Sequence, residues 1–221
     1  MKLYHLQASP FGWMARTALA EKGLKAEMVE PTDRATNPEL RQLNPLNRTP
    51  TLVDEGHVIF ESWSVLEYLD EKYPTPPLMP KDPAGRAHAR TMALLAYLYI
   101  MQDNRAAVLQ LFEWDKWDTK TMSYPPRRPA DQIDKSIVGP AEERLMGHYR
   151  ILNDELGKNP WATGPMFGNA DIVLMTAAAG YRLRGGPITE FPNVVKWLDT
   201  CLARPSVKDN ATPLVRAGKQ V

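Results

Sequence analysis

The stretch Asn47-Arg48-Thr49-Pro50-Thr51-Leu52-Val53, followed by Phe60-Glu61-Ser62-Trp63-Ser64, decides the fold of this chain. Pro50 stands at the entrance to a strand-like run, where proline is tolerated because it has no backbone N–H to give to a sheet. A cis bond before Pro50 would turn the backbone N–H and C=O of Thr49 outward, toward a peptide-like ligand. Glu61 and Ser62 come just before a helical pattern, so a carboxylate and a hydroxyl lie beside a helix N-terminus. Together these groups suit a small zwitterionic peptide.

Around this stretch, the first third of the chain alternates short strands and helices. The hydrophobic periodicity predicts three helices, the first ending at a left-handed Gly23, and the residues 54–56 predict a hairpin turn. The order strand-helix-strand-helix-strand-strand-helix indicates a thioredoxin-like α/β domain. The predicted strands are Lys2–Leu6, Ala26–Val29, Thr51–Val53 and His57–Phe60, and the predicted helices are 14–22, Asn37–Leu43 and Ser62–Lys72.

The rest of the chain reads as helical. Prolines crowd the segment Tyr73–Pro80, which cannot continue a helix and is therefore the best linker candidate. We predict an α/β domain over residues 1–78, a linker over 79–86 and an all-helical bundle domain over 87–221. Its helices are expected at 84–115, at 131–156 with a kink or a later start at Pro140, at 169–183 as the buried centre, and at 191–203. The polar tail after Pro205 is expected to pack loosely.

Composition excludes several classes of function. The net charge of +1 gives no reason to expect nucleic acid or an anionic membrane as a partner. Cys201 is the single cysteine, so an internal disulfide or a thiolate metal site is excluded, as in proteins of a reducing cytosol. The four histidines show no metal-ligand spacing, and no apolar run is long enough to cross a membrane. We therefore expect a cytoplasmic protein without a metal.

Four segments carry a family resemblance. They are residues 8–11 leading into 16–23, residues 43–45 through 48–52, residues 60–62 through 66–69, and residues 169–172. Any one of them is a weak signal, but all four in this order and at these spacings resemble the cytosolic glutathione S-transferases, in a serine-type, bacterial-like form. The resemblance implies a glutathione-binding N-terminal domain, a helical domain that supplies the second-substrate pocket, and a homodimer.

Ser9 is the candidate catalytic residue. It lies at a strand-to-helix junction, where helix N–H groups and a hydroxyl donor would stabilise a thiolate. The residues alone leave open that Ser9 only caps the helix, whereas the resemblance implies that it activates the glutathione thiol. Tyr4 is the competing hydroxyl but lies within the first strand. The relatives that form mixed disulfides have cysteine at the position of Ser9, which disfavours a thiol-transferase role.

The glutathione-binding candidates follow from the opening stretch. Glu61 would pair with the ligand ammonium, while the Ser62 hydroxyl and nearby N–H groups would receive the γ-glutamyl carboxylate. The resemblance implies that Thr49 and Pro50 clamp the cysteinyl part through the backbone and that Arg48 lies near the glycine carboxylate. For each, a purely structural role (an N-cap, a rigid turn, a solvated arginine) stays open.

The second-substrate pocket is less legible. On the geometry that the resemblance implies, Phe11, Trp13, Tyr97, Met101 and Trp114 would line it, although each could equally belong to the core. The connection 114–131, with its aromatic residues and arginines, would either cover an aromatic or anionic substrate or form a solvated loop. Asp171, expected in the first turn of the central helix, reads as structural, with Gly168 at a position where relatives usually have serine or threonine.

The predicted function is a glutathione transferase that activates the thiolate of glutathione for attack on a hydrophobic or aromatic electrophile. Its partners would be glutathione as co-substrate, the small electrophile and a second copy of the chain. Two alternatives stay open: a non-catalytic binding or regulatory module with the same fold, and a specialised enzyme that cleaves ethers, removes halogen or isomerises a double bond with glutathione.

Overall fold

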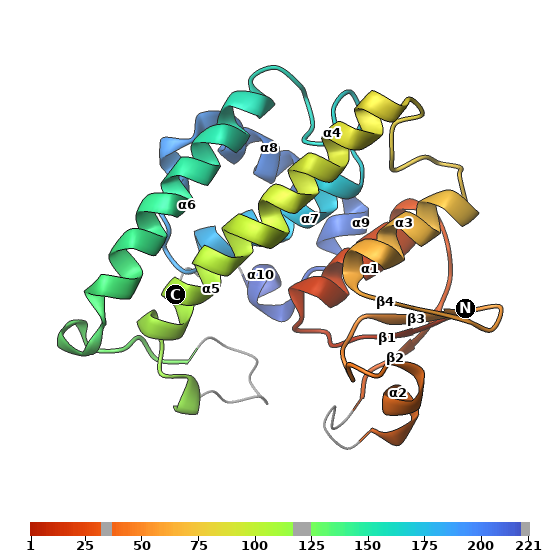
Figure 1. The fold of residues 1–221 in the computed structure, drawn as a ribbon, viewed down its shortest axis with the longest axis horizontal. Helices are drawn as coiled ribbons and strands as arrows, with labels where there is room; N and C mark the ends of the chain where they lie inside the picture. The colour runs from red at the N-terminus through yellow and green to blue at the C-terminus, as the bar shows by residue number, and fades with distance from the viewer. Residues whose placement is uncertain (32–36, 117–124, 218–221) are drawn as a thin grey trace.

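The computed structural model describes residues 1–31, 37–116 and 125–217. The chain forms two parts that lie side by side (Figure 1). A small mixed sheet with its helices makes up the N-terminal part, and a bundle of longer helices makes up the rest. The predicted α/β domain followed by an all-helical domain is therefore confirmed, while the boundaries 1–78, 79–86 and 87–221 stay predictions.

The sheet has the order β2-β1-β3-β4. Strand β1 pairs parallel to β2 and antiparallel to β3, which pairs antiparallel to β4. The hairpin between β3 and β4 turns through Glu55 and Gly56, both with positive φ, as a tight two-residue hairpin requires. The strand bounds are Lys2–Tyr4 for β1, Glu27–Val29 for β2, Thr51–Asp54 for β3 and His57–Phe60 for β4.

The described residues of this part also form three helices: α1 (Pro10–Glu21), α2 (Pro38–Leu43) and α3 (Ser62–Lys72). Helices α1 and α3 lie together on one side of the sheet and α2 on the other (Figure 1). Gly23 has φ +64°, which confirms the left-handed end predicted after the first helix. This arrangement brings the start of α1, the start of α3 and the entrance to β3 to one end of the sheet.

The helical part contains α4 (Pro83–Leu94), η1 (Leu95–Ile100), α5 (Met101–Leu111), α6 (Lys135–Leu156), α7 (Asn169–Leu183) and α8 (Pro192–Ala203). Short helical turns are η2 (Trp114–Lys116), η3 (Ala130–Gln132) and η4 (Ile188–Glu190). Helix α7 is buried along nearly its whole length and contacts α1, α4 and α8, which confirms it as the centre of this part.

Two helix predictions need correction. The helix expected at 84–115 ends at Leu111, and in its middle η1 is a π-helical turn, a wider turn that apolar spacing alone does not reveal. The helix expected at 131–156 starts at Lys135, so Pro140 neither starts nor ends it but lies inside. Asp134 caps this helix by accepting a hydrogen bond from the backbone N–H of Ser136.

Asp171 is structural, as the sequence indicated. Its buried carboxylate accepts hydrogen bonds from the backbone N–H groups of Ala162 (2.8 Å), Thr163 (3.1 Å) and Gly168 (3.0 Å) and from Trp197 Nε1 (2.7 Å). Burial raises the pKa of Asp171, an effect that these donors oppose. Steric crowding explains why glycine stands at position 168, because a Cβ there would lie 2.2 Å from the carbonyl oxygen of Leu78.

The prediction of a loosely packed tail after Pro205 is wrong. Its helices α9 (Pro205–Lys208) and α10 (Pro213–Ala217) pack against α1 and α7. Val207 is fully buried, and its carbonyl oxygen accepts a hydrogen bond from Trp13 Nε1 at 3.0 Å. Arg204 also forms a bidentate pair with Glu21 on α1. The polar composition did not indicate these contacts, because they depend on backbone carbonyls, on the Arg204–Glu21 pair and on a few buried residues such as Val207 and Ala211.

No helix of the described residues is long and apolar enough to span a membrane. The absence of a membrane partner and the cytoplasmic location both stay predictions.

Candidate functional site

Two neighbouring cavities share Phe11 and Arg48, the smaller within the sheet part and the larger between the sheet part and the helical part. The smaller has a volume of about 260 Å³ and is lined by Ser9, Phe11, Arg48, Thr49, Pro50, Glu61 and Ser62. All six residues that the sequence nominated for catalysis and glutathione binding are in this set. The elements that supply them are the start of α1, the loop before β3 and the start of α3.

Ser9 is the N-cap of α1. Its backbone is extended, and its Oγ accepts a hydrogen bond from the backbone N–H of Gly12 at 3.3 Å. That bond uses one lone pair of the hydroxyl, so the O–H hydrogen remains available for another acceptor. Gly12 is needed for this close turn, since a Cβ there would lie 2.7 Å from the carbonyl oxygen of Leu6. Ser9 therefore presents a hydroxyl hydrogen beside a helix N-terminus, at the rim of the small cavity.

Glu61 has an unusual backbone. Its φ of +68° and ψ of 125° are rarely adopted by a residue with a side chain, and such outliers gather at ligand sites. The next residue, Ser62, is buried, and its Oγ lies 2.6 Å from the hydroxyl of Tyr97 in η1. Tyr97 of the helical part thus contacts Ser62, the residue at the start of α3 that is expected to receive a carboxylate.

The loop before β3 contributes the opposite wall. The bond between Thr49 and Pro50 is cis, as the sequence suggested. Thr49 Oγ1 is buried and makes no hydrogen bond with the described residues. Asn44 holds the loop from below, because its Nδ2 donates to the carbonyl oxygen of Arg48 and to Thr51 Oγ1, each at 3.0 Å. Arg48 itself is exposed and contributes to both cavities.

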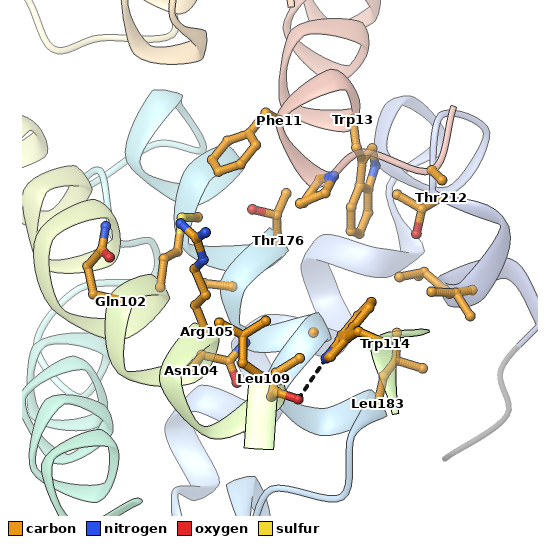
Figure 2. A pocket seen from close by; sticks show the side chains of 18 of the residues that line it. Phe11, Trp13, Gln102, Asn104, Arg105, Leu109, Trp114, Thr176, Leu183 and Thr212 are labelled. Carbon is orange, nitrogen blue, oxygen red and sulfur yellow. Dashed lines mark hydrogen bonds between the residues drawn. The ribbon is translucent and has the colours of Figure 1, made fainter. Parts of the chain in front are cut away.

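The larger cavity has a volume of about 610 Å³ (Figure 2). Phe11, Trp13, Met101 and Trp114 line it, as the sequence predicted, and the Trp114 indole is held by a 3.0 Å hydrogen bond to the carbonyl oxygen of Val108. Tyr97 is not in this lining. Instead, its ring stacks on Phe11 with a centroid distance of 6.5 Å, and its hydroxyl turns to Ser62.

Sequence reasoning missed several residues of this cavity. Arg105 and Asn104 come from α5, Thr176 and Gly180 from α7, and Thr212, Leu214 and Val215 from the tail. Helical spacing from Met101 would have indicated Arg105 and Val108, but no local signal points to the tail. Trp117 and Tyr124, two aromatic residues of the connection 114–131, lie outside the described residues.

The competing groups lie elsewhere. Tyr4 is buried and its hydroxyl is bonded to Glu39, outside both cavities. Cys201 is fully buried in α8, and that burial raises the pKa of its thiol, which disfavours a thiolate. Among the described residues no cluster of three histidine, cysteine or carboxylate side chains could hold a metal ion.

Comparison with known families now identifies the chain. Residues 3–77 match the model of the glutathione S-transferase N-terminal domain, and residues 92–205 match that of the C-terminal domain. The chain belongs to the glutathione S-transferase family. It is accordingly a glutathione transferase, with glutathione as its co-substrate, as the resemblance implied.

Individual relatives agree with this membership. Glutathione S-transferase U26 of Arabidopsis thaliana is 30% identical over 206 residues, covering 90% of this chain and 83% of that protein. Maleylacetoacetate isomerase of Pseudomonas aeruginosa is 28% identical over 214 residues, covering 94% of each. A glutathione S-transferase of Methylobacterium radiotolerans, solved in complex with glutathione sulfonate, has a TM-score of 0.71 at 28% identity and covers 95% of this chain and 93% of that one.

Proposed function

We propose that this transferase binds glutathione in the small cavity, stabilises its thiolate with the Ser9 hydroxyl, and directs the sulfur at a hydrophobic or aromatic electrophile in the larger cavity. The observation that carries the proposal is the joint lining: Phe11 and Arg48 belong to both cavities, so a sulfur at Ser9 faces the space where an electrophile would lie.

The small cavity offers the groups that a γ-glutamyl tripeptide needs. The Glu61 carboxylate would pair with the ligand ammonium, and the Ser62 hydroxyl at the N-terminus of α3 would donate to its carboxylate. Thr49 and Pro50 would hold the cysteinyl part through the backbone, and exposed Arg48 would take the glycine carboxylate. The thiol would then lie by Ser9, where the dipole of α1 and a hydroxyl donor lower its pKa.

Catalysis would come from this lowered pKa and from proximity. The thiolate forms at neutral pH, the helix N-terminus and Ser9 stabilise it, and the bound electrophile lies within reach of the sulfur. No covalent intermediate with the enzyme is needed, because the nucleophile belongs to glutathione.

The test replaces Ser9 with glycine, which removes the hydroxyl yet is tolerated at an N-cap at a cost of only a few tenths of a kcal/mol. With 1-chloro-2,4-dinitrobenzene as electrophile, we expect turnover to fall at least tenfold while the glutathione dissociation constant changes little. Ser64→Ala, an exposed serine of α3 outside both cavities, is the matched control. Equal turnover in Ser9→Gly and Ser64→Ala would remove Ser9 from the mechanism.

Isomerisation is a second candidate for this site, and the relative from Pseudomonas aeruginosa, which spans 94% of the chain, favours it over ether cleavage and dehalogenation. In isomerisation the thiolate adds to a conjugated double bond and leaves again, so glutathione is not consumed. The assay follows the absorbance of an unsaturated dicarbonyl acid together with the concentration of free thiol. A change in absorbance without loss of thiol indicates isomerisation, whereas loss of thiol indicates conjugation. Binding of glutathione with neither reaction would favour the non-catalytic module.

The homodimer belongs to the same proposal. Leu94 at the end of α4 and Leu98 in η1 are each at least half exposed and lie one helical turn apart. A second copy of the chain would cover these side chains, whose burial contributes favourably to association. Molar mass from light scattering tests this, with Leu98→Glu as the variant expected to give monomers.

A further inference from the structure

The larger cavity combines an apolar wall with a strongly one-sided charge. Phe11, Trp13, Met101, Val108, Leu109 and Trp114 supply the apolar wall. Arg48 and Arg105 are its two charged side chains, and the described lining contains neither aspartate nor glutamate. A neutral aromatic electrophile does not require an unpaired positive charge in its binding cavity, so the two arginines indicate a ligand with negative charge.

Arg105 belongs to the cavity through its position on α5. Figure 2 shows its side chain rising from the helix into the space below Phe11, with Thr176 on the other side. The nearest acid in sequence, Asp103, is engaged on the far side of the helix by Arg144 (2.7 Å) and His148 (3.2 Å) of α6. Within the described parts of the chain, no ion pair involves Arg105, so its positive charge is available to a ligand.

Asn104 adds an oriented donor on the same wall. Its Oδ1 accepts a short hydrogen bond from Arg184 Nε, and because an arginine nitrogen only donates, this bond fixes which end of the amide is which. Arg184 is itself buried and paired with Glu142 at 2.7 Å. The Asn104 Nδ2 forms no hydrogen bond with the described residues and lies on the side of Gly180, which also lines the cavity. Cation and amide donor both favour a ligand that offers acceptor oxygens.

We propose that the electrophile of this cavity carries a carboxylate on an aromatic or apolar body and that Arg105 binds this carboxylate. The inference rests on the proposed function, in which Arg48 is occupied by the glycine carboxylate of glutathione, leaving Arg105 for the second substrate. The planar guanidinium presents two parallel N–H donors to a carboxylate, a geometry that lysine lacks. The apolar wall holds the body of the substrate with its reactive carbon toward Ser9.

Two chlorinated nitroarenes form a matched pair of probes: neutral 1-chloro-2,4-dinitrobenzene and anionic 4-chloro-3,5-dinitrobenzoate. In both, the thiolate sulfur attacks the carbon that bears chlorine. A C–S bond forms, the C–Cl bond breaks, chloride leaves with the electron pair, and the thiol proton goes to solvent. The chemistry is the same, so the ratio of the two kcat/KM values isolates the recognition of the carboxylate.

The variants are Arg105→Gln, Arg105→Lys and, as a matched control, Arg150→Gln, an exposed arginine of α6 that lines neither cavity. We expect Arg105→Gln to lower kcat/KM for the benzoate about tenfold or more while that for the neutral probe changes less than twofold. Arg105→Lys should recover part of the loss, and added salt should reduce the preference of the native enzyme. Equal effects on both probes, or none on either, would overturn the proposal.

A second readout keeps this result separate from the proposed function. The preformed glutathione conjugates of both probes are titrated against the native enzyme and Arg105→Gln by calorimetry. Tighter binding of the carboxylate conjugate, lost in the variant, supports Arg105 as the recognition residue even if turnover is absent, in which case only the proposed function fails. Equal affinities of the native enzyme for the two conjugates refute the carboxylate proposal while leaving thiolate activation at Ser9 untouched.

Discussion

Among the described residues of the helical part, only Tyr97 forms a hydrogen bond with a residue of the proposed glutathione site, and removal of its hydroxyl gives a sharp test. In Tyr97→Phe the ring and its stack on Phe11 remain, while the 2.6 Å contact with Ser62 Oγ and the 3.4 Å contact with Met14 Sδ are lost. Burial raises the pKa of Tyr97 far above its ordinary value of 10, so the hydroxyl keeps its proton throughout a neutral assay.

The magnitude follows from which group donates. When Ser62 donates its hydrogen to a ligand carboxylate, its oxygen can still accept, and Tyr97 is the donor at hand. A hydrogen bond of this kind contributes about 0.5–1.5 kcal/mol. Ser62 is buried, so water replaces the lost donor poorly and the effect should lie toward the upper end. We expect the glutathione dissociation constant to rise by about 2- to 12-fold, with little change in turnover at saturating glutathione.

The assay is calorimetric titration of glutathione, with Tyr99→Phe as control. Tyr99 lies in the same π-helical turn, but its side chain is 52% exposed and packs on His148, away from both cavities. Thermal unfolding of both variants shows whether packing is intact. If Tyr97→Phe binds glutathione as tightly as Tyr99→Phe does, the hydrogen bond between Tyr97 and Ser62 has no part in ligand binding, and the prediction is refuted.

Two further predictions concern stability. Asp171→Asn keeps the shape of the side chain, but each carboxylate oxygen accepts two of the four hydrogen bonds, so either orientation of the amide leaves two buried donors unpaired. We expect the free energy of unfolding, measured in urea, to fall by about 2–6 kcal/mol. A decrease below about 1 kcal/mol would contradict this. Burial and the neighbouring Arg16 lower the pKa of His5 below its ordinary 6.5, so the unfolded chain takes up the extra proton first, and the stabilisation present above pH 6.5 is lost as the pH falls toward the folded pKa. Unfolding free energies at pH 5.5 and 7.5 should differ less in His5→Gln than in the native chain.

The small cavity could be predicted from sequence because each of its groups belongs to a local pattern. Ser9, Thr49 with Pro50, and Glu61 with Ser62 each stand at a strand start or a helix start, where the residue types themselves are informative. Topology then brings these three places together, since β1 lies next to β3 and the starts of α1 and α3 follow the same end of the sheet. Local patterns and the sheet order thus place these residues together, whereas the roles of Ser9, Thr49, Pro50 and Arg48 came from the family resemblance.

The larger cavity could not be predicted in the same way. Its walls come from α5, α7 and the tail, which meet only through tertiary packing. The π-helical turn η1 is wider than an α-helical turn, so it shifts the angular positions of all later residues about the helix axis. A regular α-helical pattern extended from α4 therefore assigns the wrong residues to the buried face of α5. The tail was misjudged because its composition is polar, whereas its packing depends on Val207 and on backbone carbonyls that Trp13 and Arg16 engage.

The two interpretations of Ser9, helix cap and thiolate donor, do not exclude each other. A hydroxyl that caps a helix must use a lone pair, because its partner is the backbone N–H of Gly12. That bond uses a lone pair of the oxygen on the side of the helix and leaves the O–H hydrogen available to an acceptor in the small cavity that Ser9 lines. An alanine would lose both roles at once, which is why the glycine variant, tolerated as a cap but without a hydroxyl, is the informative one. The capping bond thus holds the Ser9 oxygen in place and is compatible with the proposed catalytic role of its hydrogen.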